Sequence, residues 1–267
     1  MTNIRKQSLQ SLLLKMRFNG QELSTGTGFV VETAAGPVLI TNRHNVTGRH
    51  QETGELLSKE TGAIPNEMVI VHNRPFGPKG EIYGSVERLE RLFNEDETPR
   101  WREHPTLGAR ADFVALPLTQ LDEVGLMPYD LRQAGPQITI APAETVSVIG
   151  FPFGKTAGGH LAVWATGFVA SEPDVDYMGL PIMLIDCRTR EGQSGSPVIA
   201  FRNGPAATDE GALTFSRGPL QRFIGIYSGR IRKESDIGMV WKVSAIRQLI
   251  DSFNPPAPNY GIRATWG

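Results

Sequence analysis

Short apolar runs separated by Gly, Pro and Asn extend along almost the whole chain of 267 residues. Runs rich in Val, Ile and Phe and bounded by turn residues are typical of strands in an antiparallel barrel or sandwich. Only residues 243–253 space their apolar side chains as one helical face, and the two prolines that follow would end such a helix. We therefore expect an all-β fold with one C-terminal α-helix. The expected strands are 12–18, 26–32, 37–41, 67–72, 112–117, 145–150, 161–170, 182–186, 197–201, 221–228 and 238–242.

The composition disfavours several classes of protein. Basic and acidic residues nearly balance, for a net charge of −1, so no overall field favours nucleic acid or an anionic membrane. The single cysteine, Cys187, cannot form an intramolecular disulfide, which favours a reducing compartment. No stretch has the apolar core of a secretory leader, about 7–15 residues, or the ~18 apolar residues of a membrane span. We expect a cytoplasmic protein with no membrane or nucleic-acid partner.

Residues 192–197 read GQSGSP and place Ser194 between two glycines. Glycine adopts backbone angles that other residues avoid, so such a loop can turn the N–H groups of Gly192 and Ser194 toward one point beside the serine hydroxyl. That point is where a tetrahedral intermediate would place its negative oxygen, so the two N–H groups are the expected oxyanion hole. On its own, the loop also fits an ordinary glycine-rich turn between strands.

Two residues with the right chemistry precede this loop. His44 closes a strand-like run that begins at Val38, and Asp112 opens another. A serine nucleophile needs a base to take its proton, and the base needs a carboxylate to fix its tautomer. Singly, these residues fit a core histidine, a turn-capping aspartate and a loop serine. Together, in the chain order His44, Asp112, Ser194, they predict a catalytic triad in the order used by chymotrypsin.

These motifs resemble those of the trypsin/chymotrypsin-like serine peptidases, in particular the non-secreted bacterial type related to the high-temperature-requirement proteases. The resemblance covers roughly residues 20–253. It includes a glycine-flanked first strand, the histidine and aspartate motifs, the start of a second barrel, the nucleophile loop, a strand that pairs with substrate backbone and the strand before the terminal helix. These segments are 24–30, 40–46, 112–116, 148–154 with 166–171, 186–197, 225–229 and 238–243.

The resemblance implies a chymotrypsin-like fold of two six-stranded antiparallel β-barrels with the active site in the cleft between them. His44 and Asp112 would belong to the first barrel and Ser194 to the second. The expected parts are 1–125 (first barrel, with an insertion at about 73–110), 126–253 (second barrel and terminal helix) and 254–267 (tail).

Two features depart from the family pattern. Gln193 stands where secreted trypsins carry an aspartate that pairs with a freshly cut N-terminus, so activation by propeptide cleavage is not implied. We expect no PDZ domain, because only residues 254–267 follow the expected helix.

The resemblance also implies a substrate-binding pocket. No acidic residue stands at its expected base, where Arg188 would repel a cationic side chain, so we expect no preference for Lys or Arg before the scissile bond. Alternatively, Arg188 pairs with Asp186 and points away. The expected substrate-binding residues are Arg188, Thr189, Tyr227, Ser228, Gly229, Arg230 and Gly238.

Three segments are less regular. Residues 73–110 are charged and long, and we expect a solvated excursion beside the cleft that limits access, with two helical turns at 87–93. Residues 119–136 suit a linker between the halves. Residues 230–233 form a basic run, which we interpret as a solvated hairpin tip because it lacks the aromatic residues and breadth of a nucleic-acid face.

The sequence therefore predicts a serine endopeptidase (a hydrolase) that acts on protein or peptide substrates through an acyl-enzyme. The histidines lack the spacing of metal ligands, and no phosphate-binding or dinucleotide motif is present, so we expect no metal and no cofactor. One alternative is a catalytically idle module of the same fold that binds peptides or partners. Another is a protease that processes only itself. The sequence does not predict an oligomeric state.

Overall fold

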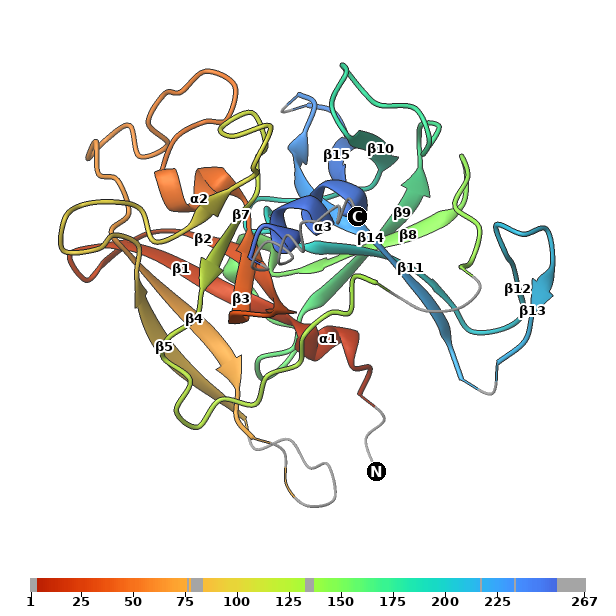
Figure 1. The fold of residues 1–267 in the computed structure, drawn as a ribbon, viewed down its shortest axis with the longest axis horizontal. Coiled ribbons are helices and arrows are strands. Elements are labelled where there is room, and N and C mark those ends of the chain that lie inside the picture. The colour runs from red at the N-terminus through yellow and green to blue at the C-terminus, as the bar shows by residue number, and fades with distance from the viewer. Residues whose placement is uncertain are drawn as a thin grey trace, which may run out of the picture.

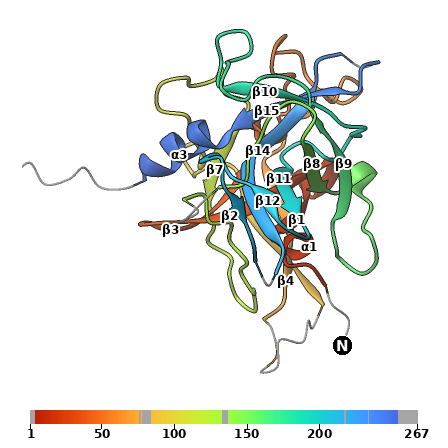
Figure 2. The same cartoon turned by 90° about the vertical axis from the view of Figure 1, so that its right-hand side faces the viewer.

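Antiparallel β-strands make up most of the structure, in two groups that follow each other along the chain (Figures 1 and 2). The computed structural model describes residues 4–75, 77, 84–132, 137–216, 218–232 and 234–253. The expected tail, the last residue of the basic run (Lys233) and the end of the expected linker (133–136) therefore lie outside the described residues.

The first group is a seven-stranded sheet in the order β5-β4-β1-β2-β3-β7-β6. The described pairings do not join the end strands β5 and β6, so the sheet is not closed. This arrangement is consistent with the first expected barrel, which stays a prediction. The bounds are β1 Ser11–Phe18, β2 Gln21–Thr33, β3 Gly36–Thr41, β4 Glu67–Asn73, β5 Ser85–Arg91, β6 Arg102–Glu103 and β7 Val114–Pro117.

The second group closes into a six-stranded barrel in the order β10-β15-β14-β11-β8-β9. This confirms the second of the two expected barrels. A small hairpin, β12 Ala206–Ala207 with β13 Leu213–Thr214, extends from it between β11 and β14 (Figure 1). The barrel strands are β8 Thr145–Gly150, β9 Val163–Val169, β10 Ile182–Asp186, β11 Pro197–Arg202, β14 Leu220–Arg230 and β15 Ile237–Lys242.

Helices are few and short in the described part of the chain. They are α1 Gln7–Gln10, α2 Arg43–Thr47, the 3₁₀ turn η1 Pro152–Gly154 and α3 Val243–Asp251. Helix α3 is the helix expected from the apolar spacing of the last segment, and it buries Ala245, Ile246, Leu249 and Ile250. Within the described ranges, no helix is long and apolar enough to cross a membrane.

All the strands expected from the sequence are present, although several begin or end at other residues. For example, β7 begins at Val114, so Asp112 lies just before the strand rather than opening it. The all-β expectation is confirmed.

Residues 87–93 are not helical, so that expectation was wrong. They lie in β5 and just after it, and β5 pairs with β4 along its whole length. Burial is inverted relative to hydrophobicity here, since Glu90 is 1% exposed and Leu89 is 40% exposed. The Glu90 carboxylate accepts a hydrogen bond from the backbone N–H of Thr119 at 2.6 Å and pairs with Arg100 at 3.1 Å. The inward-facing position of β5 is therefore filled by a carboxylate with bonded partners instead of an apolar side chain.

Other described residues of the expected excursion are also tied to the sheet, whereas its residues 76 and 78–83 lie outside the described residues. Trp101 and His104 are buried, and β6 pairs with β7. Glu103 of β6 forms an ion pair with Arg43, next to His44, at 2.8 Å. The described residues of 84–104 thus support the sheet rather than forming a lid, and of the described residues of 73–110 only Ala109 and Arg110 line the hollow described below.

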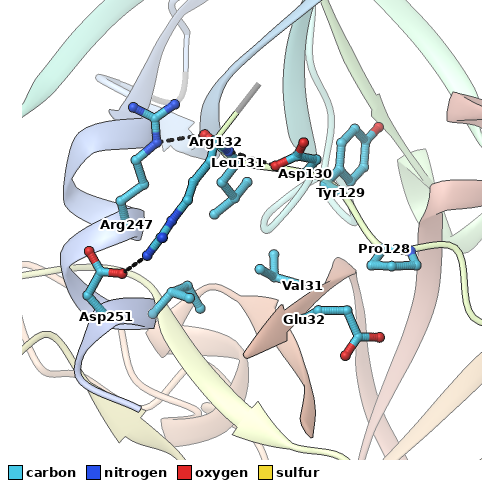
Figure 3. A pocket seen from close by; sticks show the side chains of 10 residues that line it. Val31, Glu32, Pro128, Tyr129, Asp130, Leu131, Arg132, Arg247 and Asp251 are labelled. Carbon is cyan, nitrogen blue, oxygen red and sulfur yellow. Dashed lines mark hydrogen bonds and ion pairs between the residues drawn. The ribbon is translucent and has the colours of Figure 1, made fainter. Parts of the chain in front are cut away.

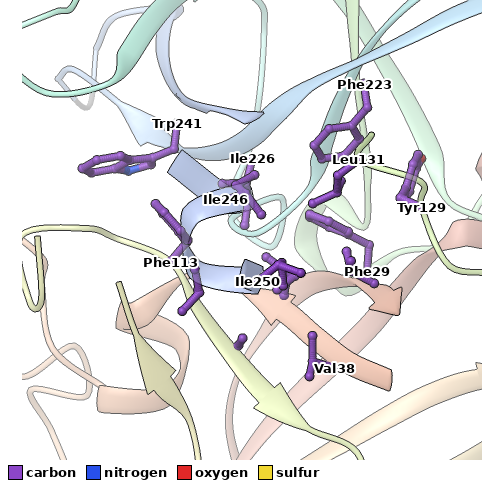
Figure 4. Close-up of a cluster of buried hydrophobic side chains, with 14 of the residues drawn as sticks. Phe29, Val38, Phe113, Tyr129, Leu131, Phe223, Ile226, Trp241, Ile246 and Ile250 are labelled. Carbon is purple, nitrogen blue, oxygen red and sulfur yellow. The ribbon is translucent and has the colours of Figure 1, made fainter. Parts of the chain in front are cut away.

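A hydrophobic cluster joins the two groups of strands (Figure 4). Phe113, directly after Asp112, packs against Trp241 of β15 with ring centroids 5.4 Å apart. Phe29 of β2 packs against Phe223 of β14 at 5.3 Å, and Tyr129 of the connecting segment contacts both rings. The cluster therefore fixes the residues around His44 and Asp112 against the barrel that carries Ser194.

We expect Phe113→Ala to lower the free energy of unfolding by about 3–5 kcal/mol, because it empties a fully buried site at this junction. Urea denaturation measures the change. Phe215→Ala is the matched control, since Phe215 is 74% exposed, and it should change stability little. A loss below about 1 kcal/mol in Phe113→Ala, well under that range, would contradict a junction held by this cluster.

Candidate active site

His44 and Asp112 lie side by side, as the sequence predicted. His44 sits on the one-turn helix α2, which follows β3 and ends at Gly48 with a positive φ of 63°. Its Nδ1 lies 3.0 and 2.8 Å from the two oxygens of the Asp112 carboxylate, and its backbone N–H donates to the same group at 3.1 Å. The carboxylate, only 3% exposed, therefore fixes both the ring and the helix that carries it.

Ser228 provides a further contact to Asp112. Its hydroxyl donates to Oδ2 of Asp112 at 2.5 Å. The register between β14 and β15 shifts between Tyr227 and Gly229, and this bulge leaves Ser228 outside the paired positions. Ser228 is also one of the expected substrate-binding residues, and its side chain orients the aspartate.

The pKa of His44 is raised above its ordinary value. Burial of the ring lowers the pKa, but the negative charge of Asp112 and its hydrogen bond to Nδ1 raise it by more. Hydrogen bonding of Nδ1–H to the carboxylate leaves Nε2 as the basic nitrogen. The ring can therefore accept a proton at Nε2 and is stabilised when it carries one.

The loop around Ser194 is held by backbone contacts that only glycine allows. Gly192 and Gly195 both have φ of +88°. A Cβ on Gly195 would lie 2.0 Å from the carbonyl oxygen of Thr27 in β2, and one on Gly192 would lie 2.4 Å from that of Phe151. Both the backbone angle and the close approach therefore require the glycines that the sequence motif contains.

Thr27 connects this loop to the first sheet. Its hydroxyl donates to the carbonyl of Gly192 at 2.8 Å and accepts from the N–H of Phe151 at 3.2 Å. Its backbone N–H donates to the carbonyl of Ser194 at 2.9 Å. Thr27 is fully buried, so no water competes for these bonds.

The expected oxyanion-hole N–H groups are free to bind an anion. The carbonyl of Glu191 accepts from the N–H of Phe153 at 2.6 Å, so the N–H of Gly192, on the other side of the same trans peptide, points the opposite way. Among the described residues, the N–H groups of Gly192 and Ser194 have no hydrogen-bond acceptor. Phe153 holds its position with an unusual φ of +53°.

Gln193 braces the loop without a charge. Its side chain is 1% exposed, and Oε1 accepts from the backbone N–H of Arg190 at 2.8 Å. Its Nε2 is buried and has no hydrogen-bond partner in the described part of the chain. A neutral amide thus occupies the position at which secreted trypsins carry a charged aspartate.

Ser194 lies next to the other two residues without being bonded to His44. Its hydroxyl donates to the carbonyl of Ser228 at 3.4 Å, and its carbonyl accepts from Nδ2 of Asn45 at 3.4 Å. Ser228 therefore contacts both Asp112 and Ser194, and Asn45 follows His44 in α2. No hydrogen bond joins Ser194 to His44 among the described residues.

The expected substrate-binding residues are divided between two environments. The Arg188 side chain is 78% exposed and lies 3.8 Å from Asp236, so it is neither the base of a buried pocket nor paired with Asp186. Thr189 is fully buried and its hydroxyl is hydrogen-bonded to that of Tyr227. Gly238 faces the Tyr227 ring.

The other expected substrate-binding residues, Ser228, Gly229 and Arg230, line a hollow of about 650 Å³ beside His44 and Asp112. We call it the His44 hollow.

A second pocket of about 260 Å³ lies elsewhere, between β2, residues 128–132 and α3 (Figure 3). Arg132 and Asp251 form an ion pair across its edge. None of the predicted catalytic residues lines the pocket in Figure 3.

Sequence reasoning missed three residues that position the site: Thr27, Asn45 and Phe153. All lie in segments quoted for the family resemblance, but nothing in a single sequence distinguishes them from their neighbours. Their roles depend on contacts between segments far apart in the chain.

Comparison with known proteins identifies the family. Residues 26–205 match the model of the trypsin-like peptidase domain, which is more than half of the chain. The chain therefore belongs to the trypsin-like peptidases and is, by class, a serine endopeptidase. A search of curated proteins found no match.

Solved structures with a TM-score of at least 0.50 show the same fold at low sequence identity. The thermostable serine protease AL20 from an extremophilic microorganism has a TM-score of 0.51 at 14% identity, covering 93% of this chain and 98% of that one. Rv3671c from M. tuberculosis H37Rv, in a mutant inactive form, gives 0.50 at 13%, covering 92% and 87%. The serine endoprotease from Yersinia pestis gives 0.47 at 12%, covering 92% of this chain but only 63% of its own length.

We expect the pKa of His44 to lie above 6.5 and to fall below it in Asp112→Asn. The substitution removes the negative charge that raises the pKa and leaves burial, which lowers it. Titration of the His44 ring resonance by NMR measures both values, with His44→Gln to assign the peak. An unchanged pKa in Asp112→Asn would contradict the assignment of its cause.

We expect Thr27→Val to reduce kcat for peptide hydrolysis by at least about tenfold, because the Gly192 carbonyl and the Phe151 N–H lose a buried partner worth about 1–3 kcal/mol each. Thr208→Val is the control, since Thr208 is also buried but lies by the β12–β13 hairpin. Equal losses of kcat in the two variants would show a general effect of cutting a buried hydroxyl.

Proposed function

We propose that this peptidase cleaves peptide bonds through an acyl-enzyme, with Ser194 as nucleophile, His44 as general base and then acid, and Asp112 as the residue that orients the imidazole. The observation that carries the proposal is the contact of Nδ1 of His44 with the buried Asp112 carboxylate, within 3.0 Å of both oxygens. It leaves Nε2 as the basic nitrogen, on a ring 16% exposed beside the Ser194 loop.

The reaction follows from these positions. The Ser194 hydroxyl turns from the Ser228 carbonyl to Nε2 of His44, gives up its proton and attacks the substrate carbonyl. The N–H groups of Gly192 and Ser194 bind the resulting oxyanion. The imidazolium, stabilised by Asp112, returns the proton to the leaving amine as the peptide bond breaks. A water molecule then hydrolyses the ester by the same route.

Substrate binding by strand addition is supported by the free edge of β14. On one side, the C-terminal end of β14 pairs with β15 through Gly229 and Arg230. On the other side, the pairing with β11 ends at Ile226. An extended peptide can therefore pair with residues 228–230 beside the nucleophile.

The domain limits 1–125, 126–253 and 254–267 remain our proposal, as does the cytoplasmic location. The location rests on the single cysteine and the apolar pattern of the sequence. We propose protein or peptide substrates without nucleic-acid or membrane partners, on the near-zero net charge.

One observation favours the idle binding module as a second candidate: the Ser194 hydroxyl is bonded to Ser228 rather than to His44. A binding module would keep this arrangement when a peptide occupies the cleft. An enzyme would leave it as the hydroxyl turns toward His44.

A fluorophosphonate probe separates the two. We expect the probe to label the protein at Ser194, and Ser194→Ala to lose labelling and at least on the order of 10⁴-fold in casein hydrolysis. Ser196→Ala, which removes the neighbouring serine of the same loop, is the control and should keep its labelling. A protein that resists the probe at pH 8 and cleaves no casein would instead be the binding module.

A further inference from the structure

The side chain of Tyr227 fills the space where the expected pocket for the P1 residue (the residue whose carbonyl is attacked) should open. By resemblance, this pocket lies between Thr189, β14 and Gly238. Tyr227 is 3% exposed, and its hydroxyl is hydrogen-bonded to Thr189, which is fully buried. A P1 side chain therefore cannot reach the base of the pocket without displacing a packed aromatic ring.

Gly238 shows how tightly the ring is held. A Cβ at Gly238 would lie 2.6 Å from Cε2 of Tyr227. On the barrel side, the ring belongs to a buried cluster that includes Ile185 and Val240. The ring thus spans the pocket from Gly238 to Thr189, which leaves room only for a small side chain next to Ser194.

The His44 hollow offers the space that the P1 pocket lacks. At about 650 Å³ it is large enough for one or two bulky side chains. Its lining includes apolar side chains from several segments: Leu57, Tyr177, Leu180, Ile182, Met239 and Trp241. The neighbouring pocket by Leu23 and Ser24, which shares His44 and Leu57 with the hollow, is only about 80 Å³.

The position of the hollow along β14 gives its place in the substrate. Its lining follows β14 away from Ser194, from Ser228 to Arg230 and on to Arg232. A substrate strand antiparallel to this edge, with its P1 residue beside Ser228, places its preceding residues beside Arg230. The hollow therefore receives side chains on the N-terminal side of the scissile bond.

The rim of the hollow is mostly cationic. Arg110, Arg230 and Arg232 line it and form no ion pair among the described residues, whereas Glu52 is the one lining carboxylate besides the buried Asp112. A substrate lysine or arginine entering the hollow would be repelled, and an apolar side chain would not.

We propose that this peptidase selects its substrates by a bulky apolar side chain at P2–P4, bound in the His44 hollow, and accepts only small residues at P1 because Tyr227 fills the P1 pocket. The proposal rests on the proposed function, since it assigns substrate positions relative to Ser194.

Two internally quenched peptides of the same length test the proposal. One has alanine at P1 and leucine at P2 and P4, and the other has leucine at P1 and alanine at P2–P4. We expect the first to be cleaved at least about tenfold faster in kcat/KM, a ratio that a single hydrophobic pocket supplies. Equal rates, or faster cleavage after leucine, would overturn the proposal.

Two pairs of variants locate the effect. Leu57→Glu places a charge in the hollow at a side chain that is 47% exposed, and should reduce cleavage of the first peptide at least about tenfold. Leu213→Glu, at a leucine 67% exposed on the distant β13, should leave it unchanged. Tyr227→Val should open the P1 pocket and favour the second peptide, whereas Tyr227→Phe keeps the ring and should not. If Tyr227→Val does not fold, the Leu57 pair still decides.

Binding separates this proposal from the proposed function. In Ser194→Ala, which cannot form an acyl-enzyme, the first peptide should still bind at least about tenfold more tightly than the second by fluorescence anisotropy. Leu57→Glu in that background should abolish the difference. Selective binding without fluorophosphonate labelling of the parent would refute the catalytic function and retain the selectivity. Labelling with no selective binding would refute the selectivity alone.

Discussion

The hydrogen bonds of Thr27 are the interaction on which the site depends. The proposed base and its aspartate follow strands of the first group, in α2 and just before β7, and the proposed nucleophile lies in the loop before β11 of the barrel, so their alignment requires a contact between the two. Thr27 provides it from β2, through its hydroxyl to Gly192 and its N–H to Ser194. Thr41 in turn fixes the carbonyl of Thr27 at 2.8 Å. Because all these groups are buried, a displaced partner would leave an unpaired polar atom, which makes the arrangement rigid.

The nucleophile loop reaches its shape without a buried ion pair. Gln193 binds the N–H of Arg190, and Phe153 binds the carbonyl of Glu191, so neutral groups orient both ends of the loop. Burying an amide costs far less than burying a carboxylate, which would need a cationic partner. The described contacts therefore hold the loop conformation through neutral groups.

The sequence predicted the strands and the residues of the candidate site because these follow local rules. Apolar runs between turns mark strands, and a serine between glycines marks a strained loop. It failed at β5, where Glu90 faces inward and Leu89 faces solvent, because Arg100 and two backbone N–H groups compensate the buried charge from other segments. It also placed Arg188 in a pocket that Tyr227 fills, since the direction of a ring inside a barrel depends on contacts that no single strand contains.

Tyr227 connects stability with specificity. Its ring is part of the barrel core with Ile185 and Val240, and the same ring limits what fits beside Ser194. Enlarging the P1 pocket would therefore remove a core side chain and cost stability. The His44 hollow is different, because residues such as Leu57 and Met178 come from loops and are partly or largely exposed. Selectivity there can change by substitution without disturbing the core. This difference in cost is a physical reason for a peptidase of this construction to recognise its substrates upstream of the scissile bond rather than at it.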